Sequence, residues 1–151
     1  AGSPGSDADA EEIAEAAESN FLRGIQLTDA NGVAEFTTIY PGWYPGRTVH
    51  IHMMVHIDGE AVDEATYDGG HVSHTGQLFF DDAISDQVYG TVEAYAGRDD
   101  SQRTRNGQDN ILGGHLDEPG FLVSLSPLDE NDPSPGLLGV ITIGVDPSVA
   151  A

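Results

Sequence analysis

Residues 47–57 read RTVHIHMMVHI, an alternation that decides the fold class. From Val49 onward the odd-numbered positions of this stretch are apolar, and His50, His52 and His56 lie between them. A period of two is typical of a β-strand that turns one face toward a core. The stretch therefore predicts a strand with three histidines on one face and an apolar row on the other.

Short apolar stretches separated by turn residues surround this strand on both sides. Upstream, strands are predicted at about residues 22–28 and 33–39, joined by the run Asp29–Gly32, whose asparagine and glycine suit a tight hairpin turn. Downstream, further strands are predicted for QLFFDD from Gln77, QVYGTVEAY at Gln87–Tyr95, FLVSLSPL from Phe121 and LLGVITIGV from Leu137. Several short strands without a strong helical pattern predict an all-β fold, an antiparallel β-sandwich with long loops.

The length of 151 residues fits one domain. Residues 1–20 are small and acidic around Ile13, so we expect a flexible acidic arm there and the folded domain at residues 21–151. Residues 96–119 are polar and glycine-rich, which predicts an exposed loop, with a substrate-binding arm as the alternative; they carry Arg98, Arg103 and Arg105. Because the chain starts at Ala1, we expect an N-terminally processed or truncated chain.

The composition excludes several classes of function. Twenty-six acidic residues stand against five arginines and no lysine, for a net charge of -21, so nucleic acid is not an expected partner. The absence of lysine excludes Schiff-base and phosphate-loop chemistry, and the absence of cysteine excludes thiolate ligands. No apolar run approaches the roughly 18 residues that span a bilayer, so no membrane partner is expected.

The histidines of the strand suggest a metal site. Residues two apart on a strand are separated by about 6.6 Å on the same face, so His50 and His52 can converge on one ion, whereas His56 lies about 13 Å beyond His52. The preceding run PGWYPGR brings Tyr44 and Arg47 to the start of the same strand through a Pro-Gly turn. A phenolate with neutral imidazoles favours Fe(III), and zinc stays possible.

The run GIQLTDANGVAEFTTIYPGWYPGRTVHIH, followed by HTGQLFFDD, resembles the core of intradiol ring-cleavage dioxygenases of the catechol and protocatechuate type. It looks most like their extracellular branch, and the resemblance covers residues 21–82. It implies a non-heme Fe(III) cofactor held by two tyrosines and two histidines, with Tyr44, His50 and His52 as the ligands present here. The family's other tyrosine lies upstream of GIQLTD, where this chain has none, which implies either a truncated chain or a site with three ligands.

The same resemblance implies roles for two further residues and a reaction. Arg47 would stabilise negative charge on the ring carbon under attack, and Gln77 would orient a substrate oxygen or hold the backbone near the site. The implied substrates are a small aromatic diol and O2, the product is a muconate-type diacid, and the setting is the breakdown of aromatic compounds by a secreted enzyme. The oligomeric state is left open.

Two alternatives of another kind stay open. One is a non-catalytic β-sandwich binding module, and the other is a zinc-dependent metalloenzyme that uses His50 and His52 with an acidic third ligand. Trp43 and Tyr40 are interpreted as the lining of an aromatic pocket for a planar substrate, with core packing as the simpler interpretation of Trp43. The remaining histidines are interpreted as loop residues; they are His71, His74 and His115.

Overall fold

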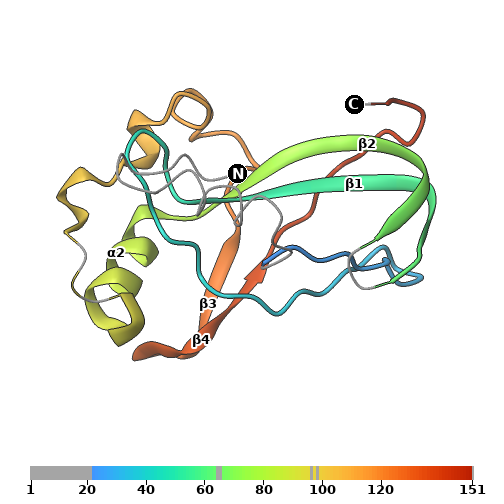
Figure 1. Ribbon diagram of the computed structural model, residues 1–151. Coiled ribbons are helices and arrows are strands. Elements are labelled where there is room, and N and C mark those ends of the chain that lie inside the picture. The colour runs from blue at the N-terminus through green and yellow to red at the C-terminus, as the bar shows by residue number, and fades with distance from the viewer. Residues whose placement is uncertain (1–21, 64–65, 96, 98, 151) are drawn as a thin grey trace, which may run out of the picture. The chain divides into compact units, whose positions relative to one another are not determined.

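A computed structural model describes residues 22–63, 66–95, 97 and 99–150 (Figure 1). The predicted acidic arm at residues 1–20 and the side chain of Arg98 lie outside these residues. The chain divides into two compact units. The first unit comprises the chain up to Tyr40 together with Met54–His74 and Asp146–Ala151, and the second unit comprises Pro41–Met53 and Thr75–Val145.

The predicted histidine strand is strand β1, His50–Ala61, which pairs with strand β2, Tyr67–Phe79, in a two-stranded sheet (Figure 1). From Ile51 to Glu60 the exposure of β1 alternates, with the odd-numbered residues half-buried and the even-numbered residues exposed, and His50 at the start of the strand is half-buried. This alternation confirms the predicted period of two. Strand β2 starts ten residues before Gln77, so the interpretation of His71 and His74 as loop residues is wrong.

The turn at Asp29–Gly32 forms as predicted, but strands on either side of it do not. Asp29 N donates to Val33 O at 2.8 Å, and Gly32 adopts a φ of +78°. Residues 22–28 and 33–39 form no strand. Their apolar side chains are largely exposed, and a hairpin without a buried face is only marginally stable in water.

The predicted strand at Gln87–Tyr95 is wrong, because helix α2, Asp82–Thr91, and the 3-10 helix η1, Glu93–Tyr95, occupy these residues. The Asp81 side chain caps α2 by accepting a bond from Ala83 N at 2.7 Å. The residues buried from α2 are Ser85 and Val88, which are spaced three apart, as on one face of a helix. An N-cap aspartate before an acidic first turn is a helix-start signal that the strand prediction overlooked.

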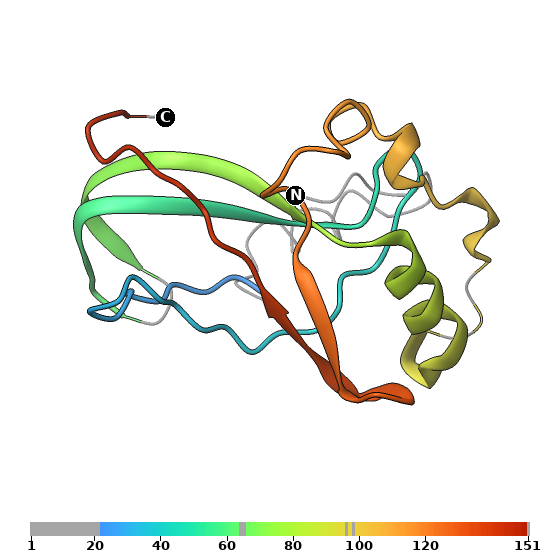
Figure 2. The ribbon, with the colours of Figure 1, turned by 180° about the vertical axis from the view of Figure 1, so that it is seen from behind.

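Strands β3, Ser124–Asp129, and β4, Asp132–Val140, form an antiparallel pair that is seen from behind in Figure 2. Ser124 pairs with Val140 and Pro127 with Leu137, and the register shifts before Asp129. Both predicted strands exist, although the last one is displaced toward the N-terminus. The described residues therefore form a β-rich fold with two antiparallel sheets and little helix, and its closure into a sandwich stays a prediction.

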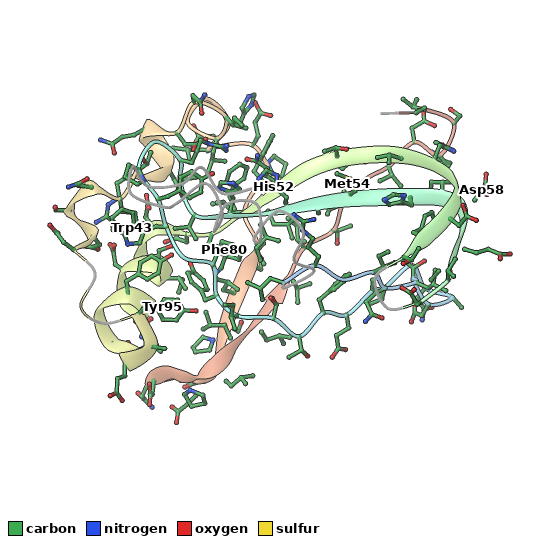
Figure 3. The ribbon with its side chains drawn as sticks, in the orientation of Figure 1. Trp43, His52, Met54, Asp58, Phe80 and Tyr95 are labelled. Atoms are coloured by element: carbon green, nitrogen blue, oxygen red, sulfur yellow. The ribbon has the colours of Figure 1, made fainter. Side chains whose placement is uncertain are left out.

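The apolar core of the second unit gathers around the end of β2. Phe79 N donates to Phe121 O at 3.2 Å, and Val123 N donates to Phe79 O at 2.9 Å, so the segment before β3 pairs with the end of β2. Trp43 is buried, which confirms its interpretation as a core residue (Figure 3). Among the residues that the structure describes, the buried apolar ones are Trp43, Val49, Phe79, Phe80, Val88 and Leu112.

The segment predicted as an exposed loop at residues 96–119 contains two 3-10 helices, η2 at Asp100–Gln102 and η3 at Asn106–Gln108. The side chain of Arg103 is fully buried and bonds to Asp82 and Asp86 of α2. The prediction of an exposed loop is therefore wrong at Arg103, because its charge is neutralised inside the unit. No helix in the described part of the chain is long and apolar enough to cross a membrane.

Candidate metal centre

The turn before β1 brings Tyr44 next to the start of the strand. Tyr44 and Arg47 form an isolated antiparallel bridge, with Pro45 and Gly46 between them. Gly46 has a φ of +93°, a conformation that residues with a Cβ rarely adopt. Gly46 N donates to Thr104 Oγ1 at 2.9 Å, which fastens the turn to the segment between η2 and η3.

A backbone carbonyl orients the His50 ring so that its second nitrogen points toward Tyr44. His50 Nδ1 lies 2.6 Å from the carbonyl oxygen of Thr48. Because a carbonyl only accepts, Nδ1 carries the proton, and the Nε2 lone pair faces the Tyr44 hydroxyl at 3.4 Å. This is how metal-binding histidines are commonly held, since a hydrogen bond on one nitrogen directs the other toward the ion.

His52 lies beside His50 on the same face of β1. The two ring centroids are 4.9 Å apart, and His52 is labelled in Figure 3. Partial burial lowers the pKa of His52, and the nearby charges of His50 and Arg47 lower it further. The side chain is therefore more often neutral at neutral pH, the form that binds metals. His56 instead packs against Tyr67, with ring centroids 4.6 Å apart.

The donor atoms present fit a ferric ion. Two ligands that each lie about 2.0–2.1 Å from one ion are about 3 Å or slightly more from each other, close to the separation between Tyr44 and His50. A phenol oxygen with imidazole nitrogens is a donor set suited to Fe(III). Among the described residues, no three histidine, cysteine, aspartate or glutamate side chains could hold an ion together. A zinc site with an acidic third ligand therefore gains no support from this part of the chain.

The two residues predicted to act on the substrate touch each other. Arg47 Nη2 donates to Gln77 Oε1 at 2.5 Å, and Arg47 Nε donates to Asp109 Oδ2 at 2.9 Å. The Arg47 side chain is only 19% exposed, so it is not an ordinary surface ion pair. The structure thus brings together Tyr44, Arg47, His50, His52 and Gln77 within the second unit.

Asp109 is a site residue that the sequence interpretation missed. Its side chain is fully buried, and its Oδ1 accepts bonds from Ile111 N and Leu112 N at 2.8 and 2.9 Å. Burial raises the pKa of this carboxyl, but the hydrogen bonds from Leu112, Thr48 and Arg47 outweigh burial and bring the pKa to about 2. Asp109 is therefore an anion at every pH near neutrality.

Thr48 and Asn106 were also missed, and they complete a buried polar network behind the histidines. Thr48 Oγ1 donates to Asn106 Oδ1 at 2.5 Å, and Asn106 Nδ2 donates to Phe80 O at 2.8 Å. Asn106 N donates to Asp82 Oδ2 at 3.0 Å. Nothing in the local sequence marks these residues, because their partners lie far away along the chain.

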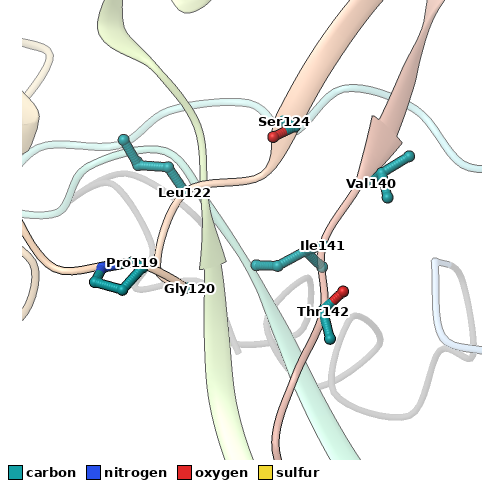
Figure 4. Close-up of a pocket in the computed structure, with 7 residues that line it drawn as sticks. All are labelled: Pro119, Gly120, Leu122, Ser124, Val140, Ile141 and Thr142. Carbon is teal, nitrogen blue, oxygen red and sulfur yellow. The ribbon is translucent and has the colours of Figure 1, made fainter.

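The second unit also contains a pocket that is separate from the predicted metal ligands. None of the predicted metal ligands lines it (Figure 4). Its lining residue Leu122 pairs with Phe79, whose ring centroid is 6.1 Å from that of His50. The lining residues are Pro119, Gly120, Leu122, Ser124, Val140, Ile141 and Thr142.

Comparison with known proteins bears on this arrangement. No family model and no curated protein matches the chain. Among solved structures, the chain is similar to an intradiol ring-cleavage dioxygenase from Tetranychus urticae, with 28% identity and a TM-score of 0.61 over 82% of this chain and 52% of that chain. A second dioxygenase structure matches with 28% identity and a TM-score of 0.58 over the same shares. The chain thus spans about half the length of these structures, and the resemblance to intradiol dioxygenases is confirmed, while the extracellular branch stays a prediction.

Proposed function

We propose that this chain carries the centre of an Fe(III)-dependent intradiol dioxygenase, which cleaves a catechol-type ring with O2 to give a muconate-type diacid. The observation that carries the proposal is the position of the Tyr44 hydroxyl 3.4 Å from His50 Nε2. The similarity to intradiol ring-cleavage dioxygenases supports it. A secreted location and a role in the breakdown of aromatic compounds are part of the proposal.

Tyr44, His50 and His52 would hold the ferric ion. A ferric ion held there would supply the Lewis acidity that makes a catechol-type ring reactive toward O2. His50 is prepared for this role because Thr48 O fixes its tautomer. Tyr44 is prepared by the turn that keeps it beside Arg47 at the start of β1.

Arg47 and Gln77 would act on the organic substrate. A guanidinium keeps its positive charge at all relevant pH values, so Arg47 can stabilise negative charge that develops on the ring. Gln77 Oε1 accepts from Arg47, and its amide nitrogen is a donor suited to a substrate oxygen. Both residues lie inside the second unit together with the proposed ligands.

The resemblance implies a second tyrosine ligand, and the hydroxyls of two described tyrosines are already bonded to the backbone. Tyr89 donates its hydroxyl to Pro41 O at 2.7 Å, and the Tyr67 hydroxyl accepts from Gly59 N at 2.7 Å. An experiment on this chain therefore tests whether Tyr44 binds iron as a tyrosinate ligand.

The test is to load the protein with Fe(III), measure iron content and visible absorption, and then add catechol in air. We expect stoichiometric iron, a tyrosinate-to-iron absorption band that shifts with catechol, oxygen uptake and a muconate-type product. A protein that binds no iron and stays colourless after ferric loading would contradict the proposal and favour a non-catalytic module. A protein that binds iron and shows the absorption band but does not cleave catechol would support the metal site and contradict the dioxygenase activity.

A further inference from the structure

We infer that Asp109 is the positioning residue of the proposed site, which holds both the Arg47 guanidinium and the backbone behind His50 through one carboxylate. The inference rests on the proposed function for its catalytic consequence. It rests on the structure alone for the contacts themselves, which form between residues far apart in the chain.

The carboxylate of Asp109 is itself rigidly held. Its Oδ1 accepts two backbone N–H groups, from Ile111 and Leu112, and its Oδ2 accepts Arg47 Nε and Thr48 N. The side chain has no exposed surface. A buried carboxylate with four donors cannot rotate without leaving donors unsatisfied, and such an unsatisfied group is costly in a protein interior.

Asp109 fixes the direction of the Arg47 side chain. A planar guanidinium bound at two of its nitrogens has a defined orientation as well as a defined position. Here Asp109 holds Nε and Gln77 holds Nη2. Without Asp109, Arg47 would keep its charge but lose one of these two anchors.

The same carboxylate reaches the metal ligand His50 through Thr48. Thr48 N donates to Asp109 Oδ2 at 2.8 Å, and Thr48 O accepts from His50 Nδ1 at 2.6 Å. Asp109 therefore fixes the residue whose carbonyl sets the tautomer and direction of the His50 ring. Loss of a partner that bonds directly to a metal ligand typically costs about 10–100-fold in metal affinity or activity, and Asp109 holds the residue that provides this partner.

The experiment compares Asp109→Asn, Arg47→Gln and the double variant with the wild type. Asp99→Asn is the matched control, because Asp99 lies in the same segment, caps η2 through Ser101 N, and can be replaced by another good N-cap residue. We would measure iron affinity, kcat at saturating iron and catechol, and the urea midpoint of the metal-free full chain.

We expect Asp109→Asn to lower kcat about 10–100-fold and to weaken iron binding, whereas Arg47→Gln lowers kcat alone. In the Arg47→Gln background, Asp109→Asn should lower kcat by less than about threefold, because its action on the ring passes through Arg47. Equal, independent losses in the two backgrounds, or an effect no larger than that of Asp99→Asn, would overturn the inference.

Two further measurements keep the inference testable. If Asp109→Asn does not fold, Arg47→Lys tests the same Arg47–Asp109 pair, because a lysine ammonium keeps the positive charge but lacks the guanidinium nitrogens that bind Asp109 and Gln77. An unchanged kcat in Arg47→Lys would contradict the positioning role of Asp109. If the wild type cleaves no catechol, the proposed function fails, and the urea midpoints alone test whether Asp109 stabilises Arg47. Non-additive midpoints for residues 47 and 109 support the anchor, and additive midpoints overturn it.

Discussion

At the scale of single residues, the phenol oxygen of Tyr44 is the atom on which the proposed metal centre depends. Tyr44→Phe removes this oxygen and keeps the ring, so iron affinity should fall by more than the about 10–100-fold typical of an outer partner, and the tyrosinate absorption should weaken. The measurement is iron titration with visible spectroscopy. His56→Ala is the control, because His56 lies on β1 with the two proposed histidine ligands but contacts Tyr67. Equal iron affinity in Tyr44→Phe and wild type would exclude Tyr44 as a ligand.

The carboxyl of Asp109 should make stability depend on pH in the acid range. Its pKa is about 2 in the folded protein against 3.8 for the ordinary group, so its contribution is fully present above pH 4 and is lost as the pH falls toward 2. The shift corresponds to about 2 kcal/mol of unfolding free energy.

Urea unfolding of the wild type and Asp109→Asn between pH 6 and pH 2.5 checks this dependence. The difference in unfolding free energy between the two proteins should narrow as the pH falls, because protonation removes in the wild type the charge that the variant already lacks. A difference that stays constant over this range would show that the carboxylate contributes no charge-dependent stability.

The sequence could reveal the residues of the site that lie close together in the chain, and it missed those that meet across long separations. Tyr44, His50 and His52 fall within one turn and one strand, so spacing and family resemblance single them out as candidate ligands. Asp109 lies 62 positions after Arg47, in a segment that reads as an exposed loop. Its role follows from burial and from four donors, which no local pattern encodes.

At the scale of elements, the turn between Tyr44 and Arg47 is controlled by the conformation of Gly46. A Cβ at this position would meet no atom within 4 Å, so Gly46→Ala costs only backbone strain, about 1–2 kcal/mol of unfolding free energy. Iron affinity should fall as well, because the turn places Tyr44 beside β1.

Gly114→Ala is the control for the Gly46 substitution. Its added Cβ also meets open space, and its backbone is outside the strained positive-φ region. Urea denaturation and iron titration of both variants provide the measurement. If the two alanine variants lose the same stability, the turn conformation is not what the site requires.

A second element-scale feature is the attachment of the η2–η3 segment to α2 by Arg103. Its guanidinium bonds to Asp82 and Asp86 and lies 5.5 Å from the centre of the Tyr89 ring. Arg103→Ala removes a fully buried guanidinium and its charged hydrogen bonds, while the two carboxylates are partly exposed and Asp86 keeps Arg105. We therefore expect a loss of about 1.5–3 kcal/mol in unfolding free energy.

The matched substitution for Arg103 is Arg105→Ala. Arg105 also pairs with Asp86, but its side chain is 43% exposed, and exposed pairs contribute about 0–1 kcal/mol. Thermal or urea unfolding should separate the two variants clearly. Similar small losses in both would mean that Arg103 does not hold this segment.

Elements were predictable where one period dominates the sequence. Strand β1 was predicted because its apolar residues alternate without interruption. Helix α2 was missed because QVYGTVEAY is rich in β-branched and aromatic residues, whereas the decisive signal is the Asp81 cap several residues earlier. Local composition favoured a strand, and capping with burial of Val88 favoured a helix.

At the scale of the whole molecule, the sequence pattern predicted the β-rich character of the chain better than it predicted which strands pair. The β-rich character followed from short apolar stretches, but the pairing of β2 with the segment before β3 did not, because nothing local specifies contacts between distant strands. Among the described residues, the fully buried apolar side chains all belong to the second unit. This unit also holds every residue of the proposed site, so its packing is what fixes the geometry of that site.

The net charge of -21 should make the stability of the whole chain depend on salt. Carboxylates at the surface repel one another, and the screening length falls from about 10 Å at 0.1 M salt to about 3 Å at 1 M. We therefore expect the Tm to rise by several degrees between these NaCl concentrations at pH 7, measured by circular dichroism. The same titration near pH 4, where part of the carboxylates are protonated, should give a smaller rise. A Tm that falls with salt at pH 7 would mean that attractive pairs such as Arg47–Asp109, although buried, are screened more strongly than the repulsion between surface carboxylates.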